Sequence, residues 1–133
     1  CISLLAALCD AGYTVSLETS GAIDVSAVDP RVVKILDIKT PASKEEARNR
    51  WANLPLLQAH DQIKFVICDR ADYDWAKGVV AEHGLNERHT VLFSPSATQL
   101  PAPELADWIV ADRLNVRFQM QLHKILWGGE AGR

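Results

Sequence analysis

The sequence predicts an α/β fold with a parallel sheet, and three observations support this prediction. Apolar runs rich in β-branched residues alternate with helix-like segments. The connections between the predicted strands are of helix length throughout, which requires the strands to lie parallel. Three strand-like runs also stop on polar clusters, at residues 18–21, 37–39 and 121–124. Ligands of parallel α/β folds sit beyond the carboxyl ends of the strands, so these clusters indicate a binding face.

Five strands and four main helices are expected. The predicted strands cover residues 13–18, 32–38, 62–68, 89–93 and 115–121. The predicted helices cover residues 2–11, 43–57, 70–83 and 104–113. This order describes about five strands with crossover helices in one domain, residues 1–133.

The first helix is predicted from the helical spacing of Leu4, Leu5 and Leu8, and Gly12 stands where a left-handed C-terminal cap would lie. A strand follows directly. Asp29 and Pro30 then signal a turn before the second strand, in which β-branched residues dominate. Proline 41 closes that strand.

The second predicted helix begins with a capping-box pattern, Ser43 as N-cap and Glu46 three positions later, and continues past the kink expected at Pro55. Glycine 84 ends the next helix, and Pro95 ends the fourth strand. Prolines at 101 and 103 introduce the last helix, which leads into the fifth strand.

Composition narrows the classes of partner. The 133 residues are 48% hydrophobic, with a net charge of −3 and no cluster of basic residues, which argues against nucleic-acid and membrane binding. The apolar first segment lacks a basic leader and a cleavage site, so we expect a cytoplasmic protein. Cys1, Cys9 and Cys68 are widely separated and are expected to be reduced thiols. The start on Cys1 suggests that the chain begins in mid-domain.

Polar residues fall on one parity of each strand. Since strand side chains alternate between faces, one face of the sheet collects the polar set and the helices cover the other. We expect the polar face to line the concave interior of an incomplete barrel that encloses a polar ligand. A water-facing sheet, or internal ion pairs joining Glu18 or Asp37 to Lys39 or Lys64, is the alternative. The polar set comprises Ser16, Glu18, Asp37, Lys39, Gln62, Lys64, Arg117, Gln119, Gln121 and His123.

Two common enzyme classes lack their sequence signals. Asp37 and His89 have no nucleophile on a sharp strand-to-helix turn to complete a hydrolase triad. The chain also has no glycine-rich phosphate-binding loop of either common type. Hydrolase and nucleotide-dehydrogenase functions are therefore disfavoured.

Five short segments follow one another through nearly the whole chain. They are Glu-Thr-Ser-Gly at 18–21, Ile-Leu-Asp-Ile-Lys-Thr-Pro at 35–41, Gln-Ile-Lys-Phe-Val-Ile at 62–67, Phe-Ser-Pro at 93–95 and Arg-Phe-Gln-Met-Gln-Leu-His-Lys at 117–124. In this order they resemble the C-terminal part of 7-carboxy-7-deazaguanine synthase. The resemblance implies a partial (β/α) barrel of the radical S-adenosylmethionine type, of which this chain would be the C-terminal half.

The resemblance also implies a reaction and its cofactors. It implies ring contraction of 6-carboxy-5,6,7,8-tetrahydropterin to 7-carboxy-7-deazaguanine with loss of ammonia, in queuosine biosynthesis. The implied cofactors are S-adenosylmethionine, a 4Fe-4S cluster and Mg²⁺, and the implied assembly is a homodimer. The cysteine motif for the cluster and the magnesium ligand are expected upstream of this chain, so the chain alone is expected to be inactive and to hold no catalytic residue.

The resemblance assigns roles by position. The segments at 37–39 and 94–97 take the places of two adenosylmethionine contacts, and Ser20 takes the place of a hydroxyl near the ribose. Gln121 and His123 are candidate substrate contacts, and the role of the tail at 127–133 is left open. The cofactor-binding candidates are Ser20, Asp37, Ile38, Lys39, Ser94, Pro95, Ser96 and Ala97.

Two other functions remain open at this point. One is a radical activating enzyme that acts on a glycine of a partner protein. The other is a catalytically silent half-barrel that serves as an adaptor or binds a small molecule.

Overall fold

The structure is a computed structural model that describes residues 2–20, 22 and 24–120. Within these residues five strands form one sheet in the order β1-β2-β3-β4-β5, and each neighbouring pair is parallel. The strands are β1 (Ser16–Thr19), β2 (Val33–Ile38), β3 (Gln62–Ile67), β4 (Thr90–Pro95) and β5 (Arg117–Phe118). The predicted α/β fold with parallel strands is confirmed.

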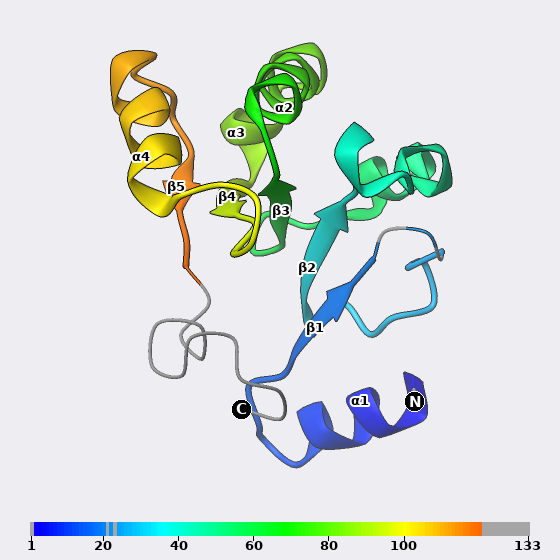
Figure 1. Cartoon of the computed structure of the whole chain (residues 1–133). Helices are drawn as coiled ribbons and strands as arrows, with labels where there is room; N and C mark the ends of the chain where they lie inside the picture. Colours follow the sequence, from blue (N-terminus) through cyan, green and yellow to red (C-terminus); the bar gives the residue numbers. More distant parts are fainter. Residues whose placement is uncertain (1, 21, 23, 121–133) are drawn as a thin grey trace.

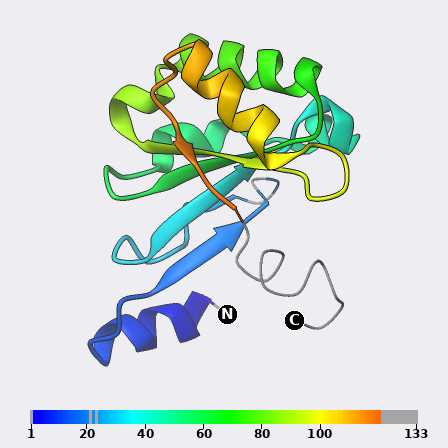
Figure 2. The ribbon, with the colours of Figure 1, turned by 60° about the vertical axis from the view of Figure 1, so that its left-hand side comes forward.

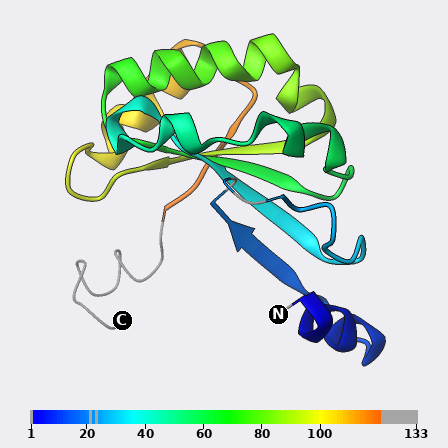
Figure 3. The same cartoon turned by 90° about the vertical axis from the view of Figure 1, so that its right-hand side faces the viewer.

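The helices lie around the outside of the curved row of strands (Figure 1). They are α1 (Ile2–Asp10), α2 (Arg70–His83), α3 (Leu85–Arg88) and α4 (Ala102–Ala111), with the 3-10 helices η1 (Pro41–Ser43), η2 (Glu46–Arg48) and η3 (Trp51–Leu56). Figures 2 and 3 show α2 and α4 over the same side of the sheet. This arrangement is a partial parallel barrel. None of its described helices has the length and apolar character needed to cross a membrane.

The main core fills the space between the sheet and the helices on its convex side. Ile63, Phe65 and Ile67 of β3 point into it and are completely buried. The ring of Phe65 meets that of Phe93 edge-on at 5.5 Å, and Tyr73 of α2 meets Phe93 at 5.9 Å. A smaller cluster packs α1 against the start of β1 and β2. Apolar burial thus fixes which side of each strand faces outward.

A buried ion pair joins β2 to the turn before β3. The Lys34 ammonium lies 3.2 Å from Asp61 Oδ2, and both side chains are almost fully buried. The other carboxylate oxygen, Oδ1, accepts the backbone N–H of Lys34 at 2.8 Å, and Oδ2 accepts the backbone N–H of Gln58 at 2.8 Å. Asp61 therefore holds the beginnings of both strands in register.

A second buried carboxylate, that of Asp72 in α2, joins the ends of β2 and β3. It accepts hydrogen bonds from the Thr40 hydroxyl at 2.8 Å, from the Ala42 N–H at 3.0 Å and from the Cys68 N–H at 3.0 Å. The side chain is 1% exposed. These bonds fix the direction in which the chain leaves β2, directly after residues 37–39.

The helix predicted over residues 43–57 is wrong. The segment forms η1, η2 and η3 instead, and Ser43 ends η1 rather than capping a helix. The Ser43 hydroxyl donates to the Thr40 carbonyl at 2.6 Å, and Lys44 adopts a left-handed φ of 61°. That φ interrupts the helical path, because successive residues of an α-helix need negative φ.

Elsewhere, the observed elements begin or end a few residues from their predicted bounds, and one helix is additional. The helix α2, with Gly84 in the left-handed region at φ 59°, agrees with prediction, as does the left-handed Gly12 after α1. The strand β1 begins at Ser16, three residues later than predicted. The strand β4 extends through Ser94 to Pro95, and the helix α3 was not predicted. The connection from β1 to β2 is long enough for a crossover and the two strands are parallel as predicted, although its described residues form no helix.

The ion pair between Lys34 and Asp61 yields a stability prediction. Replacement of Asp61 by Asn leaves the Lys34 ammonium buried without its counter-charge, which should cost about 3–5 kcal/mol of unfolding free energy. Urea denaturation measures this change. The exposed ion pair of Asp74 with Arg70 provides the matched control, since Asp74→Asn should cost less than about 1 kcal/mol. Equal losses in the two variants would contradict a structural role for the buried pair.

His89, just before β4, predicts how stability responds to acid. Burial lowers the pKa of its imidazole, and the neighbouring Arg88 lowers it further. The unfolded chain therefore binds a proton more readily than the folded chain below the ordinary histidine pKa of about 6.5. Stability should fall as the pH drops from about 7 through about 6. Urea midpoints across this range should fall less steeply for His89→Gln, and parallel curves for the variant and the wild type would refute the assignment.

Candidate functional site

The concave side of the sheet carries the predicted polar side chains. Register pairs Glu18 with Ile35 and Asp37 with Lys64, so these four side chains share one face. Their neighbours along each strand, such as Leu36 and Ile63, belong to the outer core. The parity prediction is therefore confirmed for β1, β2 and β3. The face also has apolar members, among them the buried Leu92 of β4, which pairs with Lys64 and lies beside Arg117 of β5.

A hollow lies on this face at the carboxyl ends of β1, β2 and β3. Its volume is about 140 Å³. Ligand pockets usually measure roughly 300–1,000 Å³, so a hollow of this size holds only part of a cofactor-sized molecule. Strand ends are where parallel barrels bind their ligands. The lining residues are Glu18, Thr19, Ser20, Ile35, Asp37, Lys39 and Lys64.

Three of the predicted contacts, Ser20, Asp37 and Lys39, therefore meet in one place. The Lys39 ammonium donates to Asp37 Oδ2 at 2.8 Å, and about a quarter to a third of each side chain stays exposed. This pair is one of the internal ion pairs weighed from the sequence. The other Asp37 oxygen, Oδ1, is buried and has no hydrogen-bond partner among the described residues. Buried carboxylate oxygens normally have a hydrogen-bond partner, so this oxygen of a residue that lines the hollow is a candidate acceptor for a ligand donor.

Asn49 holds the backbone of Lys39 and was missed by the sequence analysis. Its side-chain oxygen accepts the Lys39 N–H at 2.8 Å, and its amide donates to the Lys39 carbonyl at 2.8 Å. This pair of bonds fixes Lys39 beyond the end of β2. No spacing rule signals the contact, since Asn49 lies just after η2 in a segment predicted to be helical.

The remaining predicted contacts lie elsewhere. Ile38 is 3% exposed and packs in the outer core, so its side chain points away from the hollow. Ser94 lies in β4, 2% exposed, and does not line the hollow. The Ser96 N–H donates to the Ile67 carbonyl at 2.9 Å, which ties the following turn to β3. Pro95 pairs with Ile67 in the sheet, and Ala97 is exposed in the turn. Gln121, His123 and the tail at 127–133 lie outside the described residues.

The described residues do not fit an iron–sulfur cluster or another metal site. No three His, Cys, Asp or Glu side chains gather among them as a metal ion would require. Cys9 lies in α1 and Cys68 follows β3, and both are free thiols. Burial raises the pKa of Cys68, with a further contribution from Asp72. A protonated lone thiol is a poor ligand, because clusters bind several thiolates together.

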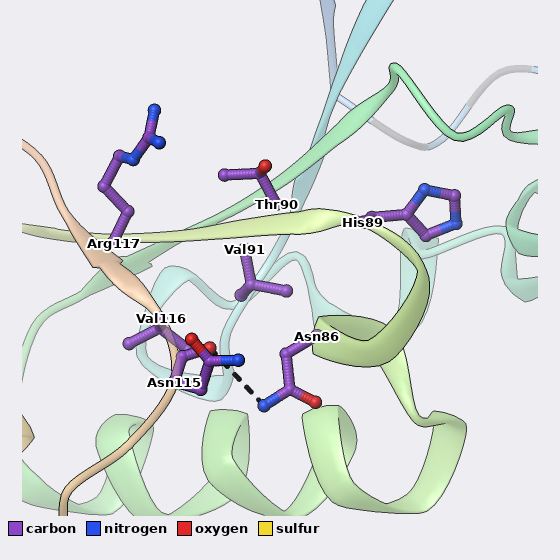
Figure 4. A pocket seen from close by; sticks show the side chains of 7 residues that line it. All are labelled: Asn86, His89, Thr90, Val91, Asn115, Val116 and Arg117. Atoms are coloured by element: carbon purple, nitrogen blue, oxygen red, sulfur yellow. Dashed lines mark hydrogen bonds between the residues drawn. The ribbon is translucent and has the colours of Figure 1, made fainter.

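A larger hollow of about 460 Å³ lies at the opposite end of β4 and β5 (Figure 4). In Figure 4 the side chains of His89 and Arg117 extend away from each other. The amide of Asn86 donates to the Asn115 carbonyl at 3.4 Å across the floor. The hollow adjoins the amino ends of the strands. In (β/α) barrels, residues at this end usually stabilise the fold, and ligands bind at the other end. The smaller hollow at residues 18–20, 35–39 and 64 is therefore the candidate site.

Comparison with known proteins shows which proteins the chain is similar to. No family model matches the chain. The chain is 44% identical over 131 residues to the 7-carboxy-7-deazaguanine synthase of Chlorobaculum tepidum, covering 96% of the chain and 60% of that protein. It is 42% identical over 132 residues to that of Koribacter versatilis, covering 90% and 58%. It is 32% identical over 133 residues to that of Thermoplasma acidophilum, covering 98% and 62%.

The chain thus spans between 58% and 62% of the length of these relatives. The matches cover β1 to β5 and the hollow at their carboxyl ends, because each extends over at least 90% of the chain. Over nearly its whole length, the chain is homologous to part of the 7-carboxy-7-deazaguanine synthases.

Proposed function

We propose that the complete protein containing this chain is a 7-carboxy-7-deazaguanine synthase. The reaction would contract the ring of 6-carboxy-5,6,7,8-tetrahydropterin to give 7-carboxy-7-deazaguanine and ammonia, as a radical S-adenosylmethionine lyase of queuosine biosynthesis. The single observation that carries this proposal is the meeting of Ser20, Asp37 and Lys39 in one hollow at strand ends, in a chain 44% identical to a synthase of that name.

The hollow fits part of S-adenosylmethionine, which is a polar, charged molecule. When bound, adenosylmethionine supplies the reactive group that starts the ring contraction. Lys39 and Asp37 would contact its polar parts, since both side chains line the hollow. The Ser20 hydroxyl, exposed beyond β1, would reach the ribose. Asn49 would keep Lys39 in place through its two backbone hydrogen bonds.

The proposed cluster and Mg²⁺ need ligands from other parts of the protein. The described residues offer no group of three metal-binding side chains. Residues from the remaining two fifths of the length of the relatives would supply them. On this proposal the chain contributes the adenosylmethionine-binding wall and no catalytic residue.

The proposal extends to the partner and the compartment. The small-molecule partner would be the carboxylated pterin, with Gln121 and His123 as substrate contacts. The complete protein would be a cytoplasmic homodimer, as the resemblance found in the sequence implies. Light scattering of the purified complete protein measures its oligomeric state.

Anaerobic reconstitution of the complete protein tests the reaction. The purified protein, loaded with iron and sulfide and given adenosylmethionine, Mg²⁺, a reductant and the carboxylated pterin, should release 5′-deoxyadenosine and 7-carboxy-7-deazaguanine, detected by mass spectrometry. Replacement of Lys39 by Met should lower kcat/KM by about 10- to 100-fold, because one charge-assisted contact is lost.

The control replaces an exposed lysine outside the hollow. Lys44→Met removes the same charge from an exposed residue that does not line the hollow, and kcat/KM should stay within about twofold of the wild type. Absence of product from protein with a fully loaded cluster would reject the function. Equal activity of the Lys39→Met and Lys44→Met variants would reject the role of Lys39.

A further inference from the structure

Lys64 is a buried lysine on the wall of the hollow. It lies in the middle of β3 with its side chain on the concave face, directly beside Asp37 of β2 in the parallel register. The residue is 8% exposed, yet it lines the hollow together with Asp37 and Lys39. Its side chain therefore forms part of the wall of the hollow.

Lys64 has no partner in the part of the chain that the structure describes. Its amine makes neither a hydrogen bond nor an ion pair with another described residue. The carboxylate next to it in the sheet, that of Asp37, directs Oδ2 to Lys39 at 2.8 Å and leaves Oδ1 unpaired. Lys64 and Asp37 are thus neighbours in the sheet, but no hydrogen bond or ion pair joins their side chains.

A comparison with Lys34 shows what a structural lysine looks like in this fold. Lys34 is 2% exposed on the opposite side of the neighbouring strand, and the fully buried Asp61 lies 3.2 Å from its ammonium. Burying a charge is costly unless a counter-charge or hydrogen bonds compensate it. The fold provides that compensation for Lys34 and does not provide it for Lys64 among the described residues. An unpaired buried lysine that faces a hollow is suited to receive an anion from a ligand.

The charges around Lys64 limit the kind of anion. Glu18 and Asp37 line the same hollow as Lys39 and Lys64, so the two carboxylates and two amines of the lining balance. A phosphate dianion would meet repulsion from both carboxylates at short range. A single ligand carboxylate is attracted by the lysine ammonium groups of the lining. Donor groups on the same ligand can bond to the carboxylates of Glu18 and Asp37. A ligand carboxylate, which is planar and carries one negative charge, therefore matches this lining better than a phosphate dianion does.

We propose that the Lys64 ammonium binds the carboxylate of the ligand that occupies this hollow. The inference rests on the proposed function, which names two ligands with a carboxylate: adenosylmethionine, in its methionine part, and the carboxylated pterin. Both present the same chemistry to Lys64. Asp37 Oδ1, next to Lys64, would accept a hydrogen bond from an amino group of the same ligand.

Binding to the complete protein, measured anaerobically by titration calorimetry, tests this proposal with two ligand pairs. One pair is adenosylmethionine and its decarboxylated analogue, and the other is 6-carboxytetrahydropterin and tetrahydropterin without the carboxylate. Replacement of Lys64 by Met should lower the affinity for the carboxylated member of one pair about 10- to 100-fold. The affinity for the partner without the carboxylate should stay within about twofold of the wild-type value. The affected pair identifies the source of the carboxylate. Lys64→Arg should restore part of the lost affinity, and Lys44→Met should change neither pair.

The outcomes separate this inference from the proposed function. If the wild-type protein binds neither adenosylmethionine nor the pterin, the proposed function fails and this inference fails with it. If the wild type binds them and Lys64→Met weakens both members of each pair equally, or neither, the function stands and the carboxylate role of Lys64 is overturned.

Stability of the ligand-free protein gives an independent readout. Lys64→Met removes the charge of a buried residue that forms no ion pair with another described residue, so its urea midpoint should equal or exceed that of the wild type. A structural lysine with a hidden counter-charge would give the opposite result, a clear loss of stability like that expected when the Lys34 ion pair is broken. Such a loss would overturn the proposal.

Discussion

The parallel register between β2 and β3 is the constraint on which the rest of the structure depends. It places Asp37 beside Lys64 on one face and sends Ile38 and Phe65 to the other. A shift of one residue would exchange the faces, burying the charged side chains in the outer core. Two buried carboxylates prevent that shift, Asp61 at the beginnings of the strands and Asp72 at their ends. Buried carboxylates on the convex side thus fix the positions of the candidate site residues on the concave side.

The two buried lysines of the described residues, Lys34 and Lys64, differ in their partners, and we propose that one stabilises the fold and the other binds a ligand. Lys34 has its counter-charge within the outer layer, where an unpaired ammonium would oppose folding. Lys64 lies on the layer that faces the hollow, where the compensation can come from a ligand. Sites of this kind cost stability in the empty protein, which is a common feature of binding sites. The concave face is accordingly the place where the sequence departs from the apolar filling of a closed barrel.

Much of the sheet and of the site could be predicted from local patterns. Alternation along residues 35–39 correctly assigned Asp37 and Lys39 to one face, and the left-handed glycine after α2 was recognised at position 84. The path after β2 could not be predicted, because the capping-box pattern at Ser43 is local while the bonds that shape the segment are not. The Asp72 carboxylate, distant in sequence, accepts the Ala42 N–H and draws the chain into η1. The Asn49 contact with Lys39 escaped notice for the same reason, since it depends on a turn that no spacing rule foretells.

Protection of lysines from chemical modification tests most directly whether the hollow at the carboxyl ends of β1 to β3 is the ligand site. The complete protein would be treated with an amine-reactive reagent with and without adenosylmethionine, and modification at each lysine quantified by mass spectrometry. Lys39, about one third exposed at the hollow, should react more slowly when the ligand is bound, while the exposed Lys44 should react at an unchanged rate. Unchanged reactivity of Lys39 under conditions in which adenosylmethionine is bound would place the ligand elsewhere and contradict this account of the concave face.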